Sequence, residues 1–409
     1  MLLLDKNNLV EYLRAKYPQW IPKGNLRVSR IGESEEDAAG LINYLFRVMG
    51  EDRSLIVKQG REDILASAGR ADFHYQLPTT RNWMEYLSLS LRGAIAPDFV
   101  PKVFAADREN NIFLMEDVSY LQLCRKELTQ GKVYPQLGRQ CAQFIAASNF
   151  YTSEFYLETD TFRKLGCYFT NTEMRRVMEQ WVFLRKPPFA DGPRAGDLRR
   201  VLEDSPEIMA ATYEMLHKFM STPESLVHAD IHTSNIFLDQ ERLKVIDMEY
   251  TFAGPCCYDV SYLLASLISQ YAAAQMRTYG APDGGERFRR YLLGTIGALL
   301  DGFIEAFSAL WDQDAKEVYR ACPAYKEKLL AGFLPDIAGY AAMPILCICL
   351  TGMSTVMEFA AISGEEKREK AVRLYFLMGC RLLLERERMR TTEDILRLLA
   401  ETAVEGSKR

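Results

Sequence analysis

Short apolar runs separated by polar residues mark the first part of the chain, up to about residue 120. They contain β-branched or aromatic residues and are bounded by Gly, Asp, Asn or Pro, a pattern typical of strands. One stretch differs, because Thr80–Leu91 places Trp83 and Tyr86 at helical spacing, with Thr79 or Thr80 available as the N-cap. The predicted strands are Leu26–Ile31, Tyr44–Val48, Leu55–Gln59, Val100–Phe104 and Ile112–Met115.

After Glu116 and Asp117 the apolar spacing turns helical almost throughout. We therefore expect an α+β protein with a β-rich lobe over residues 1–117 and a larger helical lobe over residues 118–409. The predicted helices are Gln136–Asn149, Thr172–Phe183, Gly196–Met220, Val260–Ala274, Phe288–Phe307 and further segments between Ala315 and Ala400. Lys186–Gly196 and Gly280–Glu286 are predicted loops.

Composition narrows the class of protein without changing this picture. The 409 residues are 48% apolar and 11% aromatic, which indicates a globular protein rather than a disordered one. Fifty Lys and Arg against 55 Asp and Glu give a net charge of −5, and no dense basic cluster appears. Neither nucleic acid nor an anionic membrane is therefore predicted as a partner, and we expect a small-molecule substrate.

The cysteines and the N-terminus predict a cytoplasmic protein. The nine cysteines lack paired CxxC spacing and the four histidines are dispersed, so we expect reduced thiols and no zinc site. The chain reaches Asp5 and Lys6 before a signal-like apolar run develops. The uncharged stretch Ile337–Met357 is interrupted by Pro344, and we predict a buried core helix there rather than a membrane span.

The stretch Leu226–Glu249 carries the most informative chemistry. Phosphoryl transfer needs a carboxylate that positions and deprotonates an attacking hydroxyl, and oxygen ligands for a magnesium ion that screens the triphosphate. Asp230 and Asn235 have the Asp-x4-Asn spacing of a kinase catalytic loop, and Asp247 with Glu249 follows an apolar run that ends a predicted hairpin. The pattern predicts ATP as co-substrate, Asp230 as the catalytic residue, and Asn235, Asp247 and Glu249 as ligands of Mg²⁺.

A lysine inside the predicted strand Leu55–Gln59 is a second candidate. A lysine on the inner face of a strand needs an anionic partner. We interpret Lys58 as the residue that contacts the phosphates of ATP, paired with Glu85 on the following helix. Two alternatives stay open: Lys58 points to solvent, or Glu85 forms an ordinary surface ion pair with Arg81 or Arg92.

Two further segments are predicted to contact the nucleotide. Gly32–Gly40 lies between two strands, where a phosphate-covering loop belongs, but its acidic residues Glu35–Asp37 would repel a triphosphate. Backbone amides near Gly40–Asn43 would then face the phosphates, with Asn43 as the candidate, and a solvated hairpin is the alternative. The adenine edge is expected to meet backbone groups of Met115, Glu116 and Asp117.

Three residues around Asp230 have predicted supporting roles. His228 is expected to brace the catalytic loop by hydrogen bonds rather than to transfer protons. Asp259, near the start of a helix, could cap that helix or reach back to amides of the Asp230 loop. His232 could line the acceptor pocket, or could be a loop histidine exposed by chance.

With these residues the chain resembles the aminoglycoside phosphotransferase and choline kinase group, and within it the methylthioribose kinases. Asp247-Met-Glu249 is the most specific feature, since it is similar to the Asp-x-Glu of methylthioribose kinases. The other similar segments are Ile31-Gly32, Asn43–Val48, Ile56–Gln59, Pro101–Val103, Met115–Asp117, Phe169–Asn171, His228–Thr233 and Gly254-Pro255.

The resemblance implies a protein-kinase-like fold with the nucleotide between the two lobes. It implies Asp230 as the catalytic base, and Asp247 with Glu249 as the residues that hold magnesium-ATP. It also implies transfer of the ATP γ-phosphate to the anomeric hydroxyl of 5-methylthioribose, a step of methionine salvage, by a protein that is commonly a homodimer.

The chain departs from this family at three places that bear on the site, and one of them is the segment Glu33–Ala39, which is unusually acidic for the phosphate-loop region. Ala229 replaces the usual glycine of the His-Gly-Asp loop, which a backbone with negative φ there would tolerate. The stretch Leu330–Glu366 contains no arginine or lysine, whereas methylthioribose kinases grip the sugar with an arginine pair in a C-terminal helix. If Ala338–Phe359 lines the acceptor pocket, we expect that pocket to be apolar.

Other acceptors stay open as alternatives. Another hydroxylated metabolite is one, and an aminoglycoside is a second, since the acidic segments Glu33–Asp37 and Asp283–Glu286 would suit a polycation. A nucleotide-binding pseudokinase is the third, and the presence of the predicted lysine, base and metal ligands disfavours it.

Overall fold

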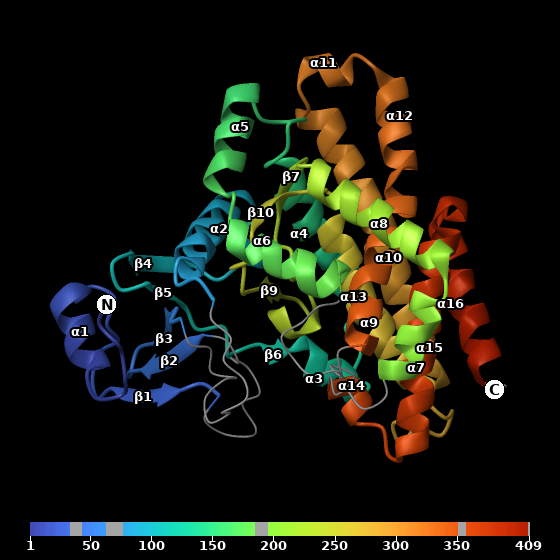
Figure 1. Cartoon of the computed structure of the whole chain (residues 1–409). Helices are drawn as coiled ribbons and strands as arrows, with labels where there is room; N and C mark the ends of the chain where they lie inside the picture. Colours follow the sequence, from blue (N-terminus) through green and yellow to red (C-terminus); the bar gives the residue numbers. More distant parts are fainter. Residues whose placement is uncertain (33–42, 63–76, 185–194, 351–356, 408–409) are drawn as a thin grey trace.

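The structure is a computed structural model, and it describes residues 1–32, 43–62, 77–184, 195–350 and 357–407. Its N-terminal part is an antiparallel five-stranded sheet with strand order β1-β2-β3-β5-β4, preceded by helix α1 (Leu9–Lys16) and drawn in blue to teal in Figure 1. The strands are β1 (Arg27–Arg30), β2 (Tyr44–Met49), β3 (Ser54–Gln59), β4 (Val103–Asp107) and β5 (Ile112–Glu116).

Strand β3 occupies the centre of this sheet, where the β-branched run of its sequence is covered on both faces. Lys58 stands opposite Leu45 on β2 and Phe113 on β5 in the strand register. Because both cross-strand neighbours are apolar, the charge of Lys58 has to be met by residues outside the sheet.

The predicted strands agree with the structure except at β4. The other four match their predicted bounds to within one residue at each end. β4 begins at Val103 instead of Val100, because Pro97–Phe99 forms a 3₁₀ turn (η2) and Pro101 has no N–H to donate to a sheet.

Helix α2 (Arg81–Ile95) packs against β4 and β5. It runs one turn further than the predicted Thr80–Leu91. Thr80 takes the N-cap position, but its side chain makes no capping hydrogen bond with the described residues.

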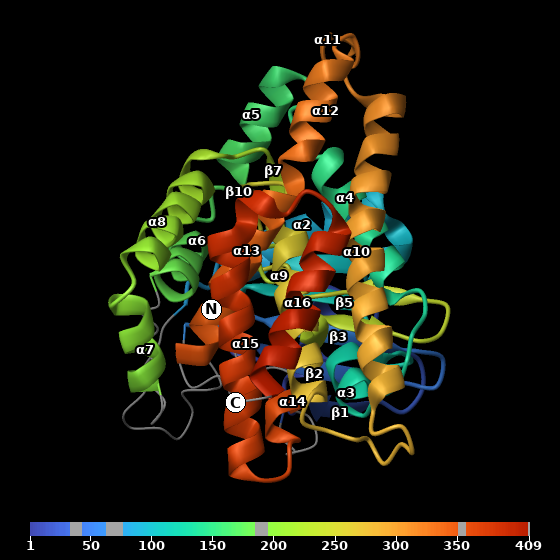
Figure 2. The ribbon, with the colours of Figure 1, turned by 90° about the vertical axis from the view of Figure 1, so that its right-hand side faces the viewer.

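The remainder of the chain is mostly helical, as Figures 1 and 2 show, and two small sheets lie inside it. One sheet pairs β7 (Ser225–Val227) with β10 (Phe252–Gly254), and the other has the order β6-β8-β9. The helices and remaining strands are β6 (Gln122–Leu123), α3 (Cys124–Thr129), α4 (Leu137–Phe150), α5 (Thr159–Tyr168), α6 (Thr172–Met178), α7 (Ala195–Glu203), α8 (Pro206–Ser221), η4 (Thr233–Asn235), β8 (Ile236–Leu238), β9 (Leu243–Val245), α9 (Tyr258–Ala274), α10 (Glu286–Asp314), α11 (Glu317–Arg320), α12 (Pro323–Ala331), α13 (Phe333–Leu350), α14 (Met357–Ala360), α15 (Glu365–Glu385), η6 (Arg386–Arg388) and α16 (Thr392–Ser407).

Helix α10 runs to Asp314, past the predicted end at Phe307, and two other predicted helices are divided in the structure. The predicted helix Gly196–Met220 is two helices, α7 and α8, because Ser205 caps α8 by accepting the Ile208 N–H and Pro206 occupies its first turn. The predicted helix Thr172–Phe183 is α6 followed by one π turn, η3 (Glu179–Phe183). The predicted loop Lys186–Gly196 lies mostly outside the described residues.

Helix α13 forms the centre of the helical part and packs against α9 and α15 (Figure 2). Among the described residues, two helical stretches, Glu286–Asp314 and Pro323–Leu350, are long and apolar enough to span a membrane by length and composition alone. The second is mostly buried inside the protein, as the core helix of a folded domain is. The prediction of a buried helix is therefore confirmed for the described part of Ile337–Met357.

The predicted α+β class is confirmed: an antiparallel sheet comes first and a mostly helical part follows, with the arrangement expected of a protein-kinase-like fold. The division into lobes at residue 117 stays a prediction. All nine cysteines are free thiols in the structure, as expected.

Candidate active site

The predicted catalytic residues lie on two loops that the small sheets hold side by side. The first loop follows β7, and the second follows the β8–β9 hairpin, whose strands pair as predicted. The Ile246 N–H donates to the Asn235 carbonyl at 3.0 Å, which ties the second loop to the first.

Asp259 anchors the first loop from helix α9. Its carboxylate accepts the His228 N–H at 2.7 Å and the Ala229 N–H at 2.9 Å, while Cys257 takes the N-cap position of α9. Of the two predicted roles for Asp259, the reach back to the loop amides is therefore the one present. The condition under which alanine would be tolerated, a negative φ, is not met, because Ala229 has φ of 69°, a conformation that glycine adopts without steric penalty.

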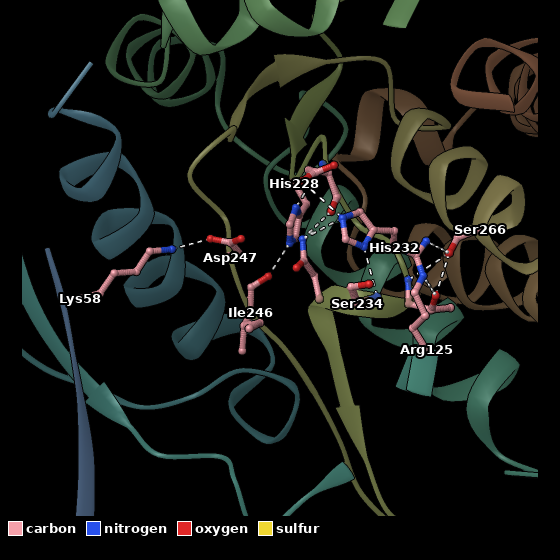
Figure 3. Close-up of polar contacts among 11 residues, drawn as sticks. Lys58, Arg125, His228, His232, Ser234, Ile246, Asp247 and Ser266 are labelled. Carbon is pink, nitrogen blue, oxygen red and sulfur yellow. Dashed lines mark hydrogen bonds and ion pairs between the residues drawn. The ribbon is translucent and has the colours of Figure 1, made fainter. Parts of the chain in front are cut away.

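His228 braces both loops, as its sequence position suggested. Its Nδ1 accepts the Asp230 N–H at 3.3 Å, and its Nε2 lies 2.9 Å from the Ile246 carbonyl, as Figure 3 shows for the latter contact. These partners require a neutral ring protonated on Nε2. Burial lowers the pKa of His228, which favours the same neutral form.

Asp230 keeps its carboxylate partly exposed, beside His232. The Asp230 Oδ2 lies 3.6 Å from the His232 Nε2, and the two side chains are 21% and 23% exposed. The His232 Nδ1 accepts the Ser234 N–H, so the ring edge toward Asp230 carries a proton. Asn235 donates from its amide to the Asp230 carbonyl at 3.0 Å, which leaves its side-chain oxygen as the atom that could reach a metal.

The side chain of Lys58, on the central strand β3, contacts two carboxylates. Its Nζ lies 2.6 Å from the Glu85 Oε2 and also contacts the Asp247 Oδ1, the latter drawn in Figure 3. Lys58 is 3% exposed and Glu85 is 1% exposed, so both alternatives, a solvent-facing lysine and a surface pair of Glu85, are wrong.

Glu249 is held by two residues of the N-terminal part. Its Oε2 accepts from the Asn43 Nδ2 at 2.7 Å and lies 3.4 Å from the Arg81 Nε. The side chain of Asn43 is therefore committed to Glu249. The amides predicted to face the phosphates are those of Gly40–Asn43, and of these residues 40–42 lie outside the described residues, as does the acidic segment before them.

The carboxylates of Glu85, Asp247 and Glu249 form one group whose ligand atoms all lie within 4.8 Å of one another. Glu85 and Glu249 are buried, and the Asp247 side chain is 33% exposed. With Lys58 and Arg81 the cluster has two cations and three carboxylates, a formal charge of −1. Burial raises the pKa of Glu85 to about 8, and it also raises that of Glu249, with Asp247 adding to both shifts. Crowded carboxylates of this kind are stabilised by a cation.

The donor set fits a magnesium ion. Hard carboxylate and amide oxygens are the ligands that Mg²⁺ prefers. The Oε1 of Glu249 has no hydrogen-bond partner among the described residues, although it is buried, so it is free to serve as a ligand.

The end of β5 offers fewer backbone groups than predicted. The Glu116 N–H donates to the Lys102 carbonyl at 2.8 Å, and the Asp117 carboxylate pairs with the Arg47 Nε at 3.0 Å. Met115 is buried on β5. An adenine edge at this strand end would therefore use backbone groups other than the Glu116 amide.

Sequence reasoning missed three groups beside the site. Arg81 is fully buried against Glu249, and its spacing of four residues from Glu85 was the available signal. Tyr262, on α9, interacts with Asp230; burial first, then the charge of Asp230, raises its pKa. Arg125 donates to the Thr233 hydroxyl at 3.2 Å from below the catalytic loop (Figure 3), and it pairs with the buried Glu358 of α14.

The described part of Ala338–Phe359 belongs mainly to α13, and most of it is core rather than an open pocket wall. The Cys347 thiol, near the end of α13, is among the groups whose charge raises the pKa of Tyr262, and α13 packs against α9, which carries Tyr262. Residues 351–356 lie outside the described residues.

Known proteins resemble this chain over nearly its whole length. The methylthioribose kinase of Geobacillus thermodenitrificans is 31% identical over 372 residues, which cover 89% of each chain. The methylthioribose kinase of Bacillus mycoides is 27% identical and covers 99% of this chain and 98% of that protein. A solved choline/ethanolamine kinase family protein from Mesorhizobium loti is 13% identical with a TM-score of 0.45, covering 98% of this chain and 100% of that one.

A family model described as a phosphotransferase enzyme family (APH) matches residues 33–292, which are more than half of the chain and include both loops of the candidate site. The chain therefore belongs to the APH phosphotransferase enzyme family.

Proposed function

We propose that the protein is an ATP-dependent kinase that phosphorylates a hydroxyl of a pentose-like sugar, with 5-methylthioribose as the leading acceptor. The observation that carries the proposal is the contact of Lys58 with both Glu85 and Asp247, which joins the central strand to the metal carboxylates. The similarity to methylthioribose kinases supports the choice of acceptor.

In this proposal Asp247 and Glu249 hold Mg²⁺, with the side-chain oxygen of Asn235 as a further ligand. The ion would supply positive charge that screens the triphosphate. Lys58 turns from Asp247 toward the phosphates when the nucleotide is present, while Glu85 keeps it in place.

Asp230 acts on the acceptor. The attacking hydroxyl oxygen forms a bond to the γ-phosphorus, the bond from that phosphorus to the β,γ-bridging oxygen breaks, and its electron pair leaves with ADP. The hydroxyl proton passes to the Asp230 carboxylate. Its exposure of 21% leaves room for this contact, and His232 and Tyr262 flank it as the acceptor-facing side chains.

A turnover assay tests the proposal. Purified protein with magnesium-ATP is given 5-methylthioribose, other pentoses, small hydroxylated metabolites and aminoglycosides, and ADP and the phosphorylated product are measured. We expect product with methylthioribose and its loss in Asp230→Asn. Product with aminoglycosides alone would move the protein to that substrate class, and nucleotide binding without any turnover would indicate a pseudokinase. The cytoplasmic location and the homodimer remain predictions that this assay does not address.

A further inference from the structure

Arg81 is a buried cation in the first turn of α2. Its relative exposure is 0%, and its Nη1 donates to the Leu77 and Pro78 carbonyls at 3.2 and 2.9 Å. Two backbone carbonyls do not neutralise a guanidinium, so the charge requires a carboxylate nearby. That carboxylate is Glu249, on the loop after β9 that carries Asp247 and Glu249, which we call the metal loop.

Two side chains, those of Arg81 and Asn43, meet at one oxygen of Glu249. The Arg81 Nε lies 3.4 Å from the Oε2 and also donates to the Asn43 Oδ1 at 3.1 Å. The Asn43 Nδ2 donates to the same Oε2 at 2.7 Å. One carboxylate oxygen is thus fixed from two sides, while the other, Oε1, has no hydrogen-bond partner in the described part of the chain.

Helix α2 also connects the contacts of Glu249 to the ion pair of Lys58 and Glu85. Arg81 and Glu85 are four residues apart, so they lie on the same face of the helix. Arg81 holds Glu249, and Glu85 holds Lys58, which in turn contacts Asp247. Helix α2 is therefore linked to both carboxylates of the metal loop.

We propose that Arg81 is a positioning residue for the metal ligand Glu249, and that it orients the free Oε1 toward the magnesium ion of the nucleotide. The inference rests on the proposed function, because it takes magnesium-nucleotide as the ligand. A glutamate has one more side-chain torsion than an aspartate, and fixing that torsion costs conformational entropy. Because Arg81 and Asn43 already hold Glu249 in the metal-free protein, this conformational entropy is lost on folding and not when the metal binds.

Binding of magnesium and the non-hydrolysable analogue AMP-PNP, measured by titration calorimetry, tests the inference without an acceptor. The variants are Arg81→Gln, which removes the charge, and Arg81→Lys, which keeps it but removes the planar fork. The matched control is Arg92→Lys on the same helix. Arg92 is equally buried, but it donates to Ser148 and the Leu226 carbonyl, and its contact nearest to the site is with the Thr251 hydroxyl at 3.5 Å rather than with Glu249 itself.

We expect Arg81→Gln to raise the magnesium concentration for half-maximal nucleotide binding by about 10-fold or more, the usual effect of removing a residue that orients a metal ligand. Arg81→Lys should give a smaller increase. Arg92→Lys should lower thermal stability without changing the magnesium requirement. Glu249→Gln should raise the requirement by itself, and adding Arg81→Gln should raise it little further, because Arg81 acts through Glu249.

An unchanged magnesium requirement in both Arg81 variants overturns the inference, and so does an additive effect in the double variant. If Arg81→Gln does not fold, Arg81→Lys decides alone, and wild-type behaviour in it overturns the inference. If the role of Arg81 is overturned while the wild type binds magnesium-nucleotide normally, the proposed kinase function still stands. If the wild type does not bind nucleotide at all, both the role of Arg81 and the proposed kinase function are wrong.

Discussion

The Asp259 carboxylate accepts the Ala229 N–H at 2.9 Å while Ala229 holds a left-handed φ of 69°. An L-residue with a Cβ pays about 1–2 kcal/mol for this conformation. The adjacent amide of His228 donates to the same carboxylate, so two hydrogen bonds to a buried acid offset the strain. The residue after Ala229 is Asp230, and the strained turn therefore sets the direction in which the proposed base leaves the loop.

Ala229→Gly should leave stability nearly unchanged. Glycine removes the left-handed strain of about 1–2 kcal/mol, while loss of a buried methyl group costs about 0.8 kcal/mol and the freer unfolded chain about 0.5–1 kcal/mol. Ala146, buried in α4, is the matched control, because Ala146→Gly has both costs and no strain to relieve. Midpoints of urea unfolding check the pair. Equal destabilisation of the two variants would mean that Ala229 is unstrained.

Asp230→Asn should lower kcat by about 10²–10⁴-fold, since general-base catalysis contributes on this scale. Asparagine keeps the shape of the side chain, so the thermal midpoint and AMP-PNP affinity should stay at wild-type values. Asp239→Asn, in the exposed turn of the β8–β9 hairpin, is the control and should retain full turnover. Near-normal kcat in Asp230→Asn would remove this carboxylate from the mechanism.

Lys58→Ala should weaken nucleotide binding, because it removes the cation proposed to contact the phosphates. It also leaves Glu85 and Asp247 without their shared partner, so thermal stability should fall as well. Lys16→Ala is a useful comparison, since Lys16 pairs with Asp107 in the same N-terminal part, away from the metal carboxylates. That variant should lose stability only. An unaltered AMP-PNP titration in Lys58→Ala would show that Lys58 does not contact the nucleotide.

The elements with local signals could be predicted from the sequence. Strand β3, the β8–β9 hairpin and α13 each have a distinct apolar pattern, and the structure contains all three. The pairing of Lys58 with Glu85 was also accessible, since a lysine inside an apolar strand needs a carboxylate nearby.

Features that depend on distant residues could not be predicted in this way. The spacing of Arg81 from Glu85 places the two on one helix face, but only the structure shows that Arg81 is buried beside Glu249. The positive φ of Ala229 has no signal either, because alanine rarely adopts it. The pair of Arg125 and Glu358 joins two short helices far apart in the chain.

Stability should fall between pH 7 and pH 5 because of His228. Burial lowers its pKa below the ordinary 6.5, and Arg92 adds to this shift while Asp259 opposes it. The unfolded chain therefore binds a proton at this residue before the folded protein does as the pH falls. The stability that the neutral ring contributes is complete above about pH 6.5 and is lost as the pH falls toward the folded pKa.

Urea midpoints of the wild type and of His228→Gln across this pH range isolate the effect. Carboxylates such as Glu85, whose pKa is raised, act in the opposite direction but are common to both proteins. The urea midpoint of the wild type should therefore approach that of His228→Gln as the pH falls. A constant difference would show that His228 does not titrate in this window.

The acceptor pocket should favour apolar substituents on the sugar. No arginine or lysine occurs between Leu330 and Glu366, and the apolar helix α13 packs against α9, which carries Tyr262 beside Asp230. Shape and dispersion, rather than ionic contacts, would then hold the 5-substituent, so methylthioribose itself should bind weakly.

Each added methylene that becomes buried should raise kcat/KM by about fourfold, the equivalent of about 0.8 kcal/mol. A series of 5-alkylthioriboses at fixed magnesium-ATP measures this, with Tyr262→Phe as a control that removes only the hydroxyl. If kcat/KM stays flat or declines along the series, the pocket around Tyr262 is not apolar.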